Sequence, residues 1–124
     1  MKVPAGHQQV IPYLVIRNAE QFYGFAQQAF GAIEKMRVYD EETKVFKHGE
    51  ISIGGSVIMF GQTNDNWGTQ NAGLFIYVES ADDSYQKAIH AGAKEVLPLS
   101  DQSYGRTCGV EDPFGNTWWI TSVQ

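Results

Sequence analysis

The sequence contains two copies of one pattern of residues, and this repeat restricts the possible folds more than any other feature. An apolar stretch that ends at Ala19 leads into a segment that contains Tyr23. Both landmarks return 62 positions later, as Ala81 and Tyr85. The glycine that closes the segment returns after 61 positions, and a glycine turn before an apolar strand returns after 60. Four landmarks in the same order favour two copies of one module over a chance likeness of two short patterns.

The end of the second copy contains a turn with a clear signature. Asp112-Pro113-Phe114-Gly115 has the residue types of a type I turn, because Asp can accept backbone N–H groups, Pro fixes φ and Gly relieves strain at the last position. The residues after the turn are β-branched and aromatic, which predicts a strand. The residues before it predict the partner strand, so we expect a hairpin near the end of the chain.

Each copy predicts one strand, one helix and then three strands, which is an α+β fold. The expected helices cover roughly residues 19–30 and 81–91. The expected strands cover residues 10–17, 33–40, 44–53, 56–61, 73–79, 94–99, 104–111 and 116–123. The chain is expected to form a single domain, with module 1 at about 9–62, a polar linker at 63–71 and module 2 at about 72–124.

Polar residues at the start of each helix segment predict caps. Asn18 can cap the first helix, with Gln21 placed to reach back as in a capping box. Ser80 with Asp83 repeats this pattern before the second helix. Residues 1–8 have no period and are expected to form a loose lead-in.

Charge and composition exclude several classes of protein. The formal net charge is −5, which opposes binding to nucleic acid, where basic side chains supply most of the affinity, and to anionic membranes. Apolar runs are no longer than a strand, and the N-terminus lacks the apolar segment of a signal peptide. The single cysteine, Cys108, cannot form an intrachain disulfide. We therefore expect a cytoplasmic protein that binds neither nucleic acid nor membrane.

Several motifs in this order resemble one superfamily. They are Ile11-Pro12-Tyr13-Leu14, Ala29-Phe30-Gly31-Ala32, His48-Gly49-Glu50 and Asp112-Pro113-Phe114-Gly115. Over about residues 9–122 the chain resembles the vicinal oxygen chelate superfamily, which includes glyoxalase I, extradiol dioxygenases and bleomycin- and fosfomycin-resistance proteins, and within it the PhnB-like branch. The resemblance implies tandem βαβββ modules that form a curved, barrel-like mixed sheet with helices outside and a ligand cavity inside. It also implies a homodimer with the cavity at or near the subunit interface.

Enzymes of that superfamily hold a divalent metal with His, Gln or Glu side chains from the first and last strand of each module. The resemblance puts these four positions at Ile11, Met59, Gly73 and Trp119. Neither isoleucine nor glycine has a donor atom, an indole N–H cannot accept, and a lone thioether suits soft metals. We therefore expect no metal and no other cofactor.

Strand alternation assigns side chains to the cavity wall or to the core. It places Tyr13, Met59, Phe75, Tyr77 and Trp119 toward the cavity, with the Trp119 indole projecting into it. Their aliphatic neighbours then face the helices. An aromatic wall of this kind is typical of a site for a flat, partly apolar ligand. The alternatives are that these side chains fill a collapsed barrel or bury one another at a dimer interface.

Four further residues are site candidates. His48 and Glu50 lie two positions apart on one strand and form either an acid–base pair or a surface ion pair. Arg106 either meets an anionic ligand group, as the resemblance implies, or pairs with a carboxylate such as Glu111. Trp67 in the polar linker either packs as a lid or belongs to an interface.

Two functions follow from the sequence. The first is a metal-free protein that binds a small molecule in an aromatic cavity. The alternative is a glyoxalase-like lyase or isomerase whose active site was rebuilt from residues such as His7, His48 and Glu50. The expected partners are a small-molecule ligand and a second copy of the chain.

Overall fold

A computed structural model describes residues 1–123; Gln124, which the predicted second module includes, lies outside the described residues. The first module contains β1 (Tyr13–Ile16), a short 3₁₀ helix (Ala19–Gln21), α1 (Phe22–Phe30), β2 (Ile33–Tyr39), β3 (Phe46–Ile53) and β4 (Ser56–Gln62). The second contains β5 (Gly73–Tyr77), α2 (Ala81–His90), β6 (Lys94–Gln102), β7 (Gly105–Glu111) and β8 (Thr117–Ser122). The α+β fold and the order βαβββ in each module are confirmed.

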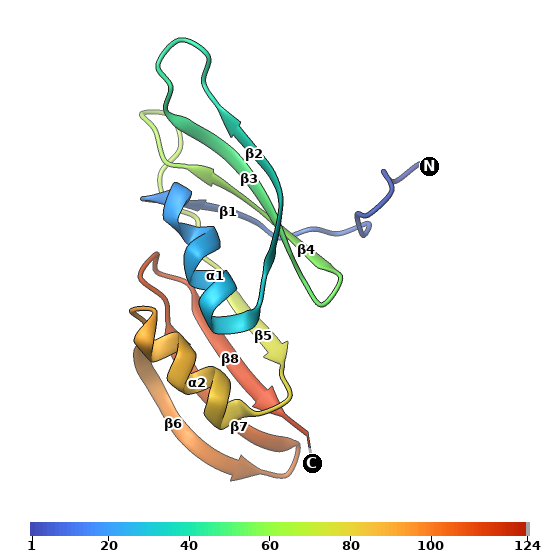
Figure 1. Cartoon of the computed structure of the whole chain (residues 1–124), viewed down its shortest axis with the longest axis vertical. Helices are drawn as coiled ribbons and strands as arrows, with labels where there is room; N and C mark the ends of the chain where they lie inside the picture. The colour runs from blue at the N-terminus through green and yellow to red at the C-terminus, as the bar shows by residue number, and fades with distance from the viewer. Residues whose placement is uncertain (124) are drawn as a thin grey trace.

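Each module forms its own four-stranded mixed sheet. The strand orders are β1-β4-β3-β2 and β5-β8-β7-β6. In both sheets the first strand runs parallel to the last, and the other neighbours are antiparallel. Parallel neighbours need a long crossover, and each module supplies it with its helix and two further strands. Figure 1 shows the two sheets end to end, with α1 and α2 side by side.

Burial alternates along the strands as the sequence predicts. Leu14 is only 2% exposed, whereas its neighbour Tyr13 is 49% exposed. Leu74 packs against the core, while Phe75 beside it is exposed. In β1 and β5 the period of two therefore puts aliphatic side chains in the core and aromatic side chains on the opposite face.

The core is continuous across the two modules. The rings of Phe30 in α1 and Trp118 in β8 lie 4.6 Å apart between centroids. Phe22, also in α1, contacts Phe114 of the second module edge to face at 5.4 Å. Helix α1 thus packs against residues of the other half of the repeat, and burial of these aromatic rings joins the two modules.

The turn before β8 is held by the carboxylate of Asp112. Its Oδ1 accepts the backbone N–H groups of Phe114 and Asn116, both at 2.9 Å. Its Oδ2 accepts from Asn116 Nδ2 at 3.0 Å and from Trp118 Nε1 at 2.8 Å. The predicted role of this aspartate in the turn is confirmed, and the same side chain also fixes the first large residue of the strand that follows.

The predicted cap at Asn18 is wrong. Asn18 has a left-handed backbone with φ 54° and makes no side-chain cap hydrogen bond. Instead, the side-chain oxygen of Gln62, at the end of β4, accepts the N–H of Ala19 at 2.9 Å. The predicted cap of α2 is confirmed, because the Ser80 hydroxyl accepts the N–H of Asp83 at 3.2 Å.

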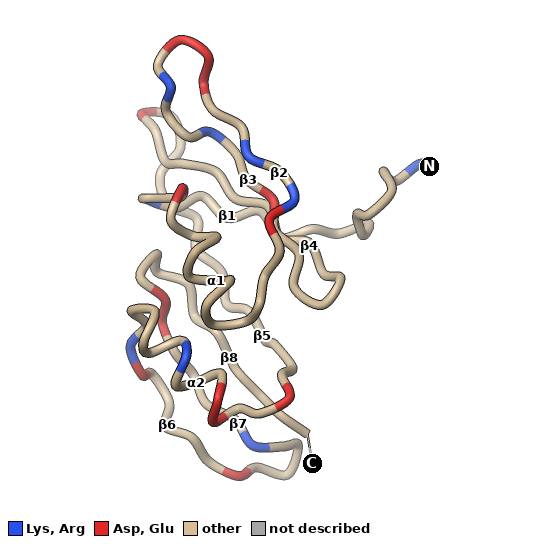
Figure 2. Tube along the Cα trace, viewed as in Figure 1, with Lys and Arg blue, Asp and Glu red and all other residues tan. Residues whose placement is uncertain are grey.

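Charged side chains avoid the middle of the molecule. Figure 2 shows them on the β2–β3 hairpin, on α2 and on the β6–β7 hairpin of the second sheet. Strands β1, β4, β5 and β8 contain no Asp, Glu, Lys or Arg. Within residues 1–123, no helix combines the length and apolar character that crossing a membrane requires.

Candidate functional site

The faces of the two sheets opposite the helices carry large apolar side chains in contact with solvent. We call this surface the open face and define it by Tyr13, Met59, Phe75, Tyr77 and Trp119. Tyr13, Phe75 and Tyr77 are exposed, and Met59 and Trp119 are half-buried. Exposed apolar patches on uncharged strands are uncommon on proteins that act alone, and they mark ligand or subunit contacts. The structure therefore places all five predicted wall residues on one type of surface.

Two of the predicted binding residues line the same cavity. Tyr13 of β1 and Trp67 of the linker border a cavity of about 440 Å³, together with Val15 and Gly61. This volume falls within the usual range for small-molecule sites. Tyr13 and Trp67 are separated by 54 positions of sequence, so the fold has to bring them together.

The linker that carries Trp67 is anchored at both of its ends. Gln70 exchanges two backbone hydrogen bonds with Val15 of β1, at 3.1 and 2.8 Å. The side-chain oxygen of Asn64 accepts the backbone N–H groups of Asn66 and Trp67, each at 2.8 Å. The Trp67 side chain is nevertheless 59% exposed. Trp67 therefore has a fixed backbone and belongs to the lining of the cavity, and its role as a lid stays a prediction.

A chain of polar side chains begins at Tyr13. The Tyr13 hydroxyl lies 3.1 Å from Nδ1 of His48, and the two rings stack with centroids 5.6 Å apart. His48 Nε2 lies 2.9 Å from Oε2 of Glu50. His7 Nε2 lies 2.7 Å from Oε1 of the same carboxylate. The sequence candidates His48 and Glu50 are thus in contact, and both residues belong to a larger cluster.

The carboxylate of Glu50 is the centre of this cluster. Glu50 is 6% exposed, and burial of a carboxylate is costly unless hydrogen-bond donors surround it. Hydrogen bonds from His48 and then His7 hold the pKa of Glu50 below its ordinary value, although burial opposes this. Glu50 is therefore ionised at neutral pH and accepts one hydrogen bond at each oxygen. Surface pairing, the alternative for His48 and Glu50, does not fit a carboxylate this buried.

The start of the chain is less loose than the sequence predicts. His7 bonds to Glu50, and its Nδ1 is buried without a partner among the described residues. Gln8 donates to the backbone oxygen of Val57 at 2.8 Å and accepts its N–H at 3.2 Å. No local sequence pattern predicts these contacts, because the partners are more than 40 positions apart in the sequence.

Trp119 lies against the sheet and does not project away from it. A Cβ atom placed on Gly109, its neighbour in β7, would be 2.5 Å from Cζ3 of the indole. Only glycine leaves room for this close approach. The indole of Trp119 therefore packs over Gly109 and is half-buried, and its contribution to a ligand cavity stays a prediction.

Phe75 and Tyr77 contribute to a different cavity. They contact each other edge to face at 5.2 Å. Both border a cavity of about 480 Å³ that also includes Val57 and Pro12 of the first module. Within one chain, the predicted wall is therefore divided between two cavities, and Tyr13 does not face Phe75 or Tyr77 across one site.

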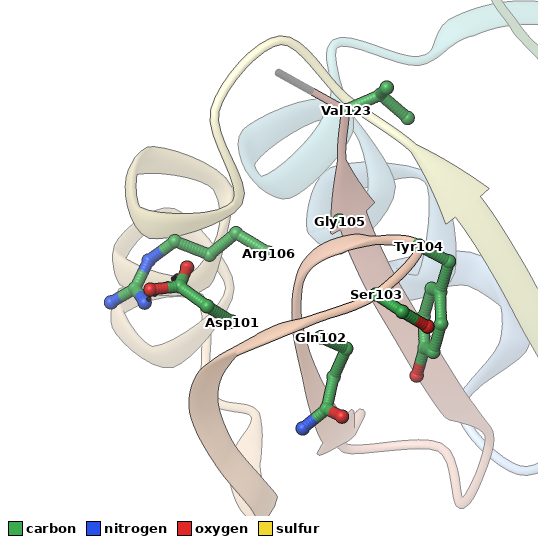
Figure 3. Close-up of a pocket in the computed structure, with 7 residues that line it drawn as sticks. All are labelled: Asp101, Gln102, Ser103, Tyr104, Gly105, Arg106 and Val123. Carbon is green, nitrogen blue, oxygen red and sulfur yellow. Dashed lines mark hydrogen bonds and ion pairs between the residues drawn. The ribbon is translucent and has the colours of Figure 1, made fainter.

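Arg106 lies away from the open face. Its Nε donates to Asp82 of α2 at 2.6 Å, and its Nη1 donates to Asp101 of β6 at 3.1 Å. Figure 3 shows Arg106 beside Asp101, with Tyr104 directed to the other side of the hairpin, around a separate cavity of about 410 Å³. These hydrogen bonds raise the pKa of Arg106. The ion-pair alternative holds, with Asp82 and Asp101 in place of the expected Glu111.

The residues present do not fit the metal that the fold family implies. The four family positions are occupied by Ile11, Met59, Gly73 and Trp119, which are poor ligands for divalent ions. In the polar cluster each histidine is directed at its own oxygen of Glu50. Across residues 1–123, no group of three or more His, Cys, Asp or Glu side chains is arranged to hold a metal ion.

Cys108 does not belong to a site. It is fully buried beneath α2. Burial raises the pKa of its thiol to about 11, so the reactive thiolate is scarce at neutral pH. Cys108 therefore packs in the core.

Comparison with known proteins agrees with the fold described above. The chain is 31% identical over 119 residues to the uncharacterized protein Rv0887c of Mycobacterium tuberculosis, covering 86% of this chain and 69% of that protein. Its fold is similar to that of TioX from Micromonospora sp. ML1, with a TM-score of 0.75, 20% identity and coverage of 93% and 98%. It is also similar to the PhnB protein from Bacillus cereus, with a TM-score of 0.69, 15% identity and coverage of 94% and 100%. The sequence profile of the Glyoxalase/Bleomycin resistance protein/Dioxygenase superfamily matches residues 8–120, and the chain belongs to this superfamily.

Proposed function

We propose that this protein binds a flat, partly apolar small molecule without a metal, and that Tyr13 and Trp67 are its main contacts. The observation that carries the proposal is that these two aromatic side chains border one cavity of about 440 Å³. Aromatic rings offer a large contact area at a small cost in side-chain entropy. The anchored backbone of the linker lowers the cost of ordering Trp67 further.

The proposal includes a homodimer. The open face leaves Phe75 and Tyr77 exposed in a single chain, and a second copy is the occupant that the family resemblance favours. The subunit contact would also bring further apolar side chains close to the ligand. Contributions of Met59, Phe75, Tyr77 and Trp119 to binding are predictions of this arrangement. A single-chain mass in light scattering at micromolar concentration would contradict the dimer.

The experiment is a titration of the purified protein with 2-methoxynaphthalene, a flat and mostly apolar probe, followed by tryptophan fluorescence and by equilibrium dialysis. Saturable binding that weakens in Tyr13→Ala and in Trp67→Ala supports the proposal. Metal analysis of the same sample after dialysis is expected to find no stoichiometric divalent ion. Metal near one equivalent, together with loss of binding on chelation, would contradict the metal-free site.

One observation favours a second candidate function. The contacts among Tyr13, His48, Glu50 and His7 are those of an acid–base group next to a cavity. A glyoxalase-like lyase or isomerase is therefore the alternative. Turnover of a 2-oxoaldehyde with a thiol, lost in Glu50→Gln, would establish the enzyme in place of the binding protein.

A further inference from the structure

We infer that Glu50 and His48 fix the direction of the Tyr13 hydroxyl, so that the cavity selects flat ligands with an acidic hydroxyl group, such as phenols and enols. The inference rests on the proposed function and names the ligand class of that site. It follows from three distances that link four side chains, and from the position of the Tyr13 oxygen.

The carboxylate of Glu50 decides which group donates and which accepts in each of these hydrogen bonds. Glu50 is ionised at neutral pH and only accepts hydrogen bonds. His48 Nε2, 2.9 Å from Oε2, must therefore carry a proton. In a neutral imidazole the other nitrogen is then an acceptor. His48 Nδ1, at 3.1 Å from the Tyr13 hydroxyl, accepts the phenolic proton.

This arrangement of donors and acceptors leaves the Tyr13 oxygen able only to accept a further hydrogen bond. The phenol has one proton, and the proton is donated to His48. A second group that approaches the oxygen meets a lone pair and has to donate a proton of its own. The Glu50–His48 pair is the orienting arrangement found where a base is held in one tautomer by a third group. His7 contacts the second oxygen of Glu50. Each oxygen therefore has its own partner, and these two contacts hold the carboxylate in place.

The Tyr13 oxygen lies at the cavity. A Cβ atom placed on Gly61 would lie 3.0 Å from the hydroxyl oxygen, so the phenol crosses directly over this glycine. Gly61, Tyr13 and Trp67 all border the same cavity. Glycine inside a strand often marks a place where another group approaches closely. Gly61 in β4 is such a glycine, and the group that approaches it is the Tyr13 hydroxyl.

The ligand class follows from these two features together. The rings of Tyr13 and Trp67 offer apolar contact to a flat ligand, and the Tyr13 oxygen offers one acceptor at its edge. A phenol or enol hydroxyl is a better donor than an alcohol because its conjugate base is delocalised. An ether of the same shape has no proton to donate, and it would lose this hydrogen bond while keeping the stacking contact.

The test compares two probes with the same ring system, 2-naphthol and its methyl ether 2-methoxynaphthalene, with the wild-type protein at pH 8, where an imidazole is ordinarily neutral. The quantity measured is the ratio of their dissociation constants. Tyr13→Phe keeps the ring and removes the acceptor, so the preference for 2-naphthol is expected to fall about fivefold, which is the usual size of one net hydrogen bond. Glu50→Gln is expected to lower the preference as well, because the tautomer of His48 is no longer fixed.

The control variant is Tyr104→Phe, which removes an exposed hydroxyl at the β6–β7 hairpin, outside this cavity and away from the open face, and is expected to leave the ratio unchanged. Thermal melting checks that each variant is folded. If Tyr13→Phe weakens both probes equally or changes neither, the inference is wrong and the proposed function stands. If neither probe binds the wild-type protein at millimolar concentration, both the inference and the proposed function are wrong.

Discussion

The indole nitrogen of Trp118 donates a hydrogen bond to Oδ2 of Asp112 at 2.8 Å, in a site where both side chains are almost fully buried. This contact connects the turn before β8 to the largest side chain of the core. Because the same carboxylate also accepts three hydrogen bonds from Phe114 and Asn116, no oxygen of Asp112 is left without a donor.

We expect Asp112→Asn to destabilise the protein by about 2–4 kcal/mol, since an amide group has only one oxygen and turns its NH₂ toward buried donors. Urea unfolding followed by circular dichroism measures the free energy of unfolding. Asp65→Asn, an isosteric change at an exposed position, is the matched control and should change the unfolding midpoint little. Equal effects of the two substitutions would contradict the role of the Asp112 carboxylate.

Trp118 and Trp119 are neighbours with opposite surroundings, so their replacement should have different effects. Trp118 is 1% exposed and packs on Phe30. Trp118→Ala is expected to lower the free energy of unfolding by about 3–5 kcal/mol, as large core residues do when truncated to alanine. Trp119→Ala removes a half-buried ring from the open face and should cost less stability. A larger loss of stability for Trp119→Ala would show that the two faces are assigned backwards.

The buried carboxylate of Glu50 makes stability depend on pH at the acid end. Its folded pKa is lowered from the ordinary value of 4.5, mainly by the hydrogen bond from His48. The unfolded chain therefore binds this proton first, and the stabilising contribution of Glu50 is present above the unfolded pKa and lost as the pH falls through the folded pKa. Urea midpoints between about pH 5 and pH 3 should fall more steeply for the wild type than for Glu50→Gln. Parallel curves would contradict this prediction.

Arg106 should have no part in ligand binding. Its guanidinium pairs with Asp82 and Asp101 on the side of α2. Arg106→Ala is therefore expected to leave the affinity for 2-methoxynaphthalene unchanged, whereas Tyr13→Ala weakens it. Because exposed ion pairs contribute little to stability, the melting temperature should also change little. Loss of binding in Arg106→Ala would mean that the ligand site lies at the β6–β7 hairpin.

Patterns with a short period were predicted correctly from the sequence. Tyr13 and Leu14 face opposite sides because a strand alternates with a period of two, and the aspartate of the turn accepts the expected N–H groups. The same alternation, applied to β7, would have placed Arg106 with the buried Cys108 and Val110 under α2. This parity agrees with the ion-pair alternative for Arg106, whose partners are Asp82 and Asp101.

Contacts between distant segments were not predictable in the same way. Asn18 was the local choice for a cap, but the amide of Gln62 reaches Ala19 from β4, 43 positions away. His7 meets Glu50 across the same separation. Residue types suggested that His48 and Glu50 could act together. Only the fold shows that Tyr13 is hydrogen-bonded to His48 and lies at a cavity.

The contact between Phe30 and Trp118 makes the stability of each module depend on the other. A polypeptide that stopped after β4 would expose the face of Phe30 that packs on Trp118, and one that began at β5 would expose the matching face of Trp118. Neither half has a complete interior of its own. A single module, expressed alone, is therefore expected to need a second copy of a module to cover this surface. The whole chain should accordingly unfold in one cooperative step.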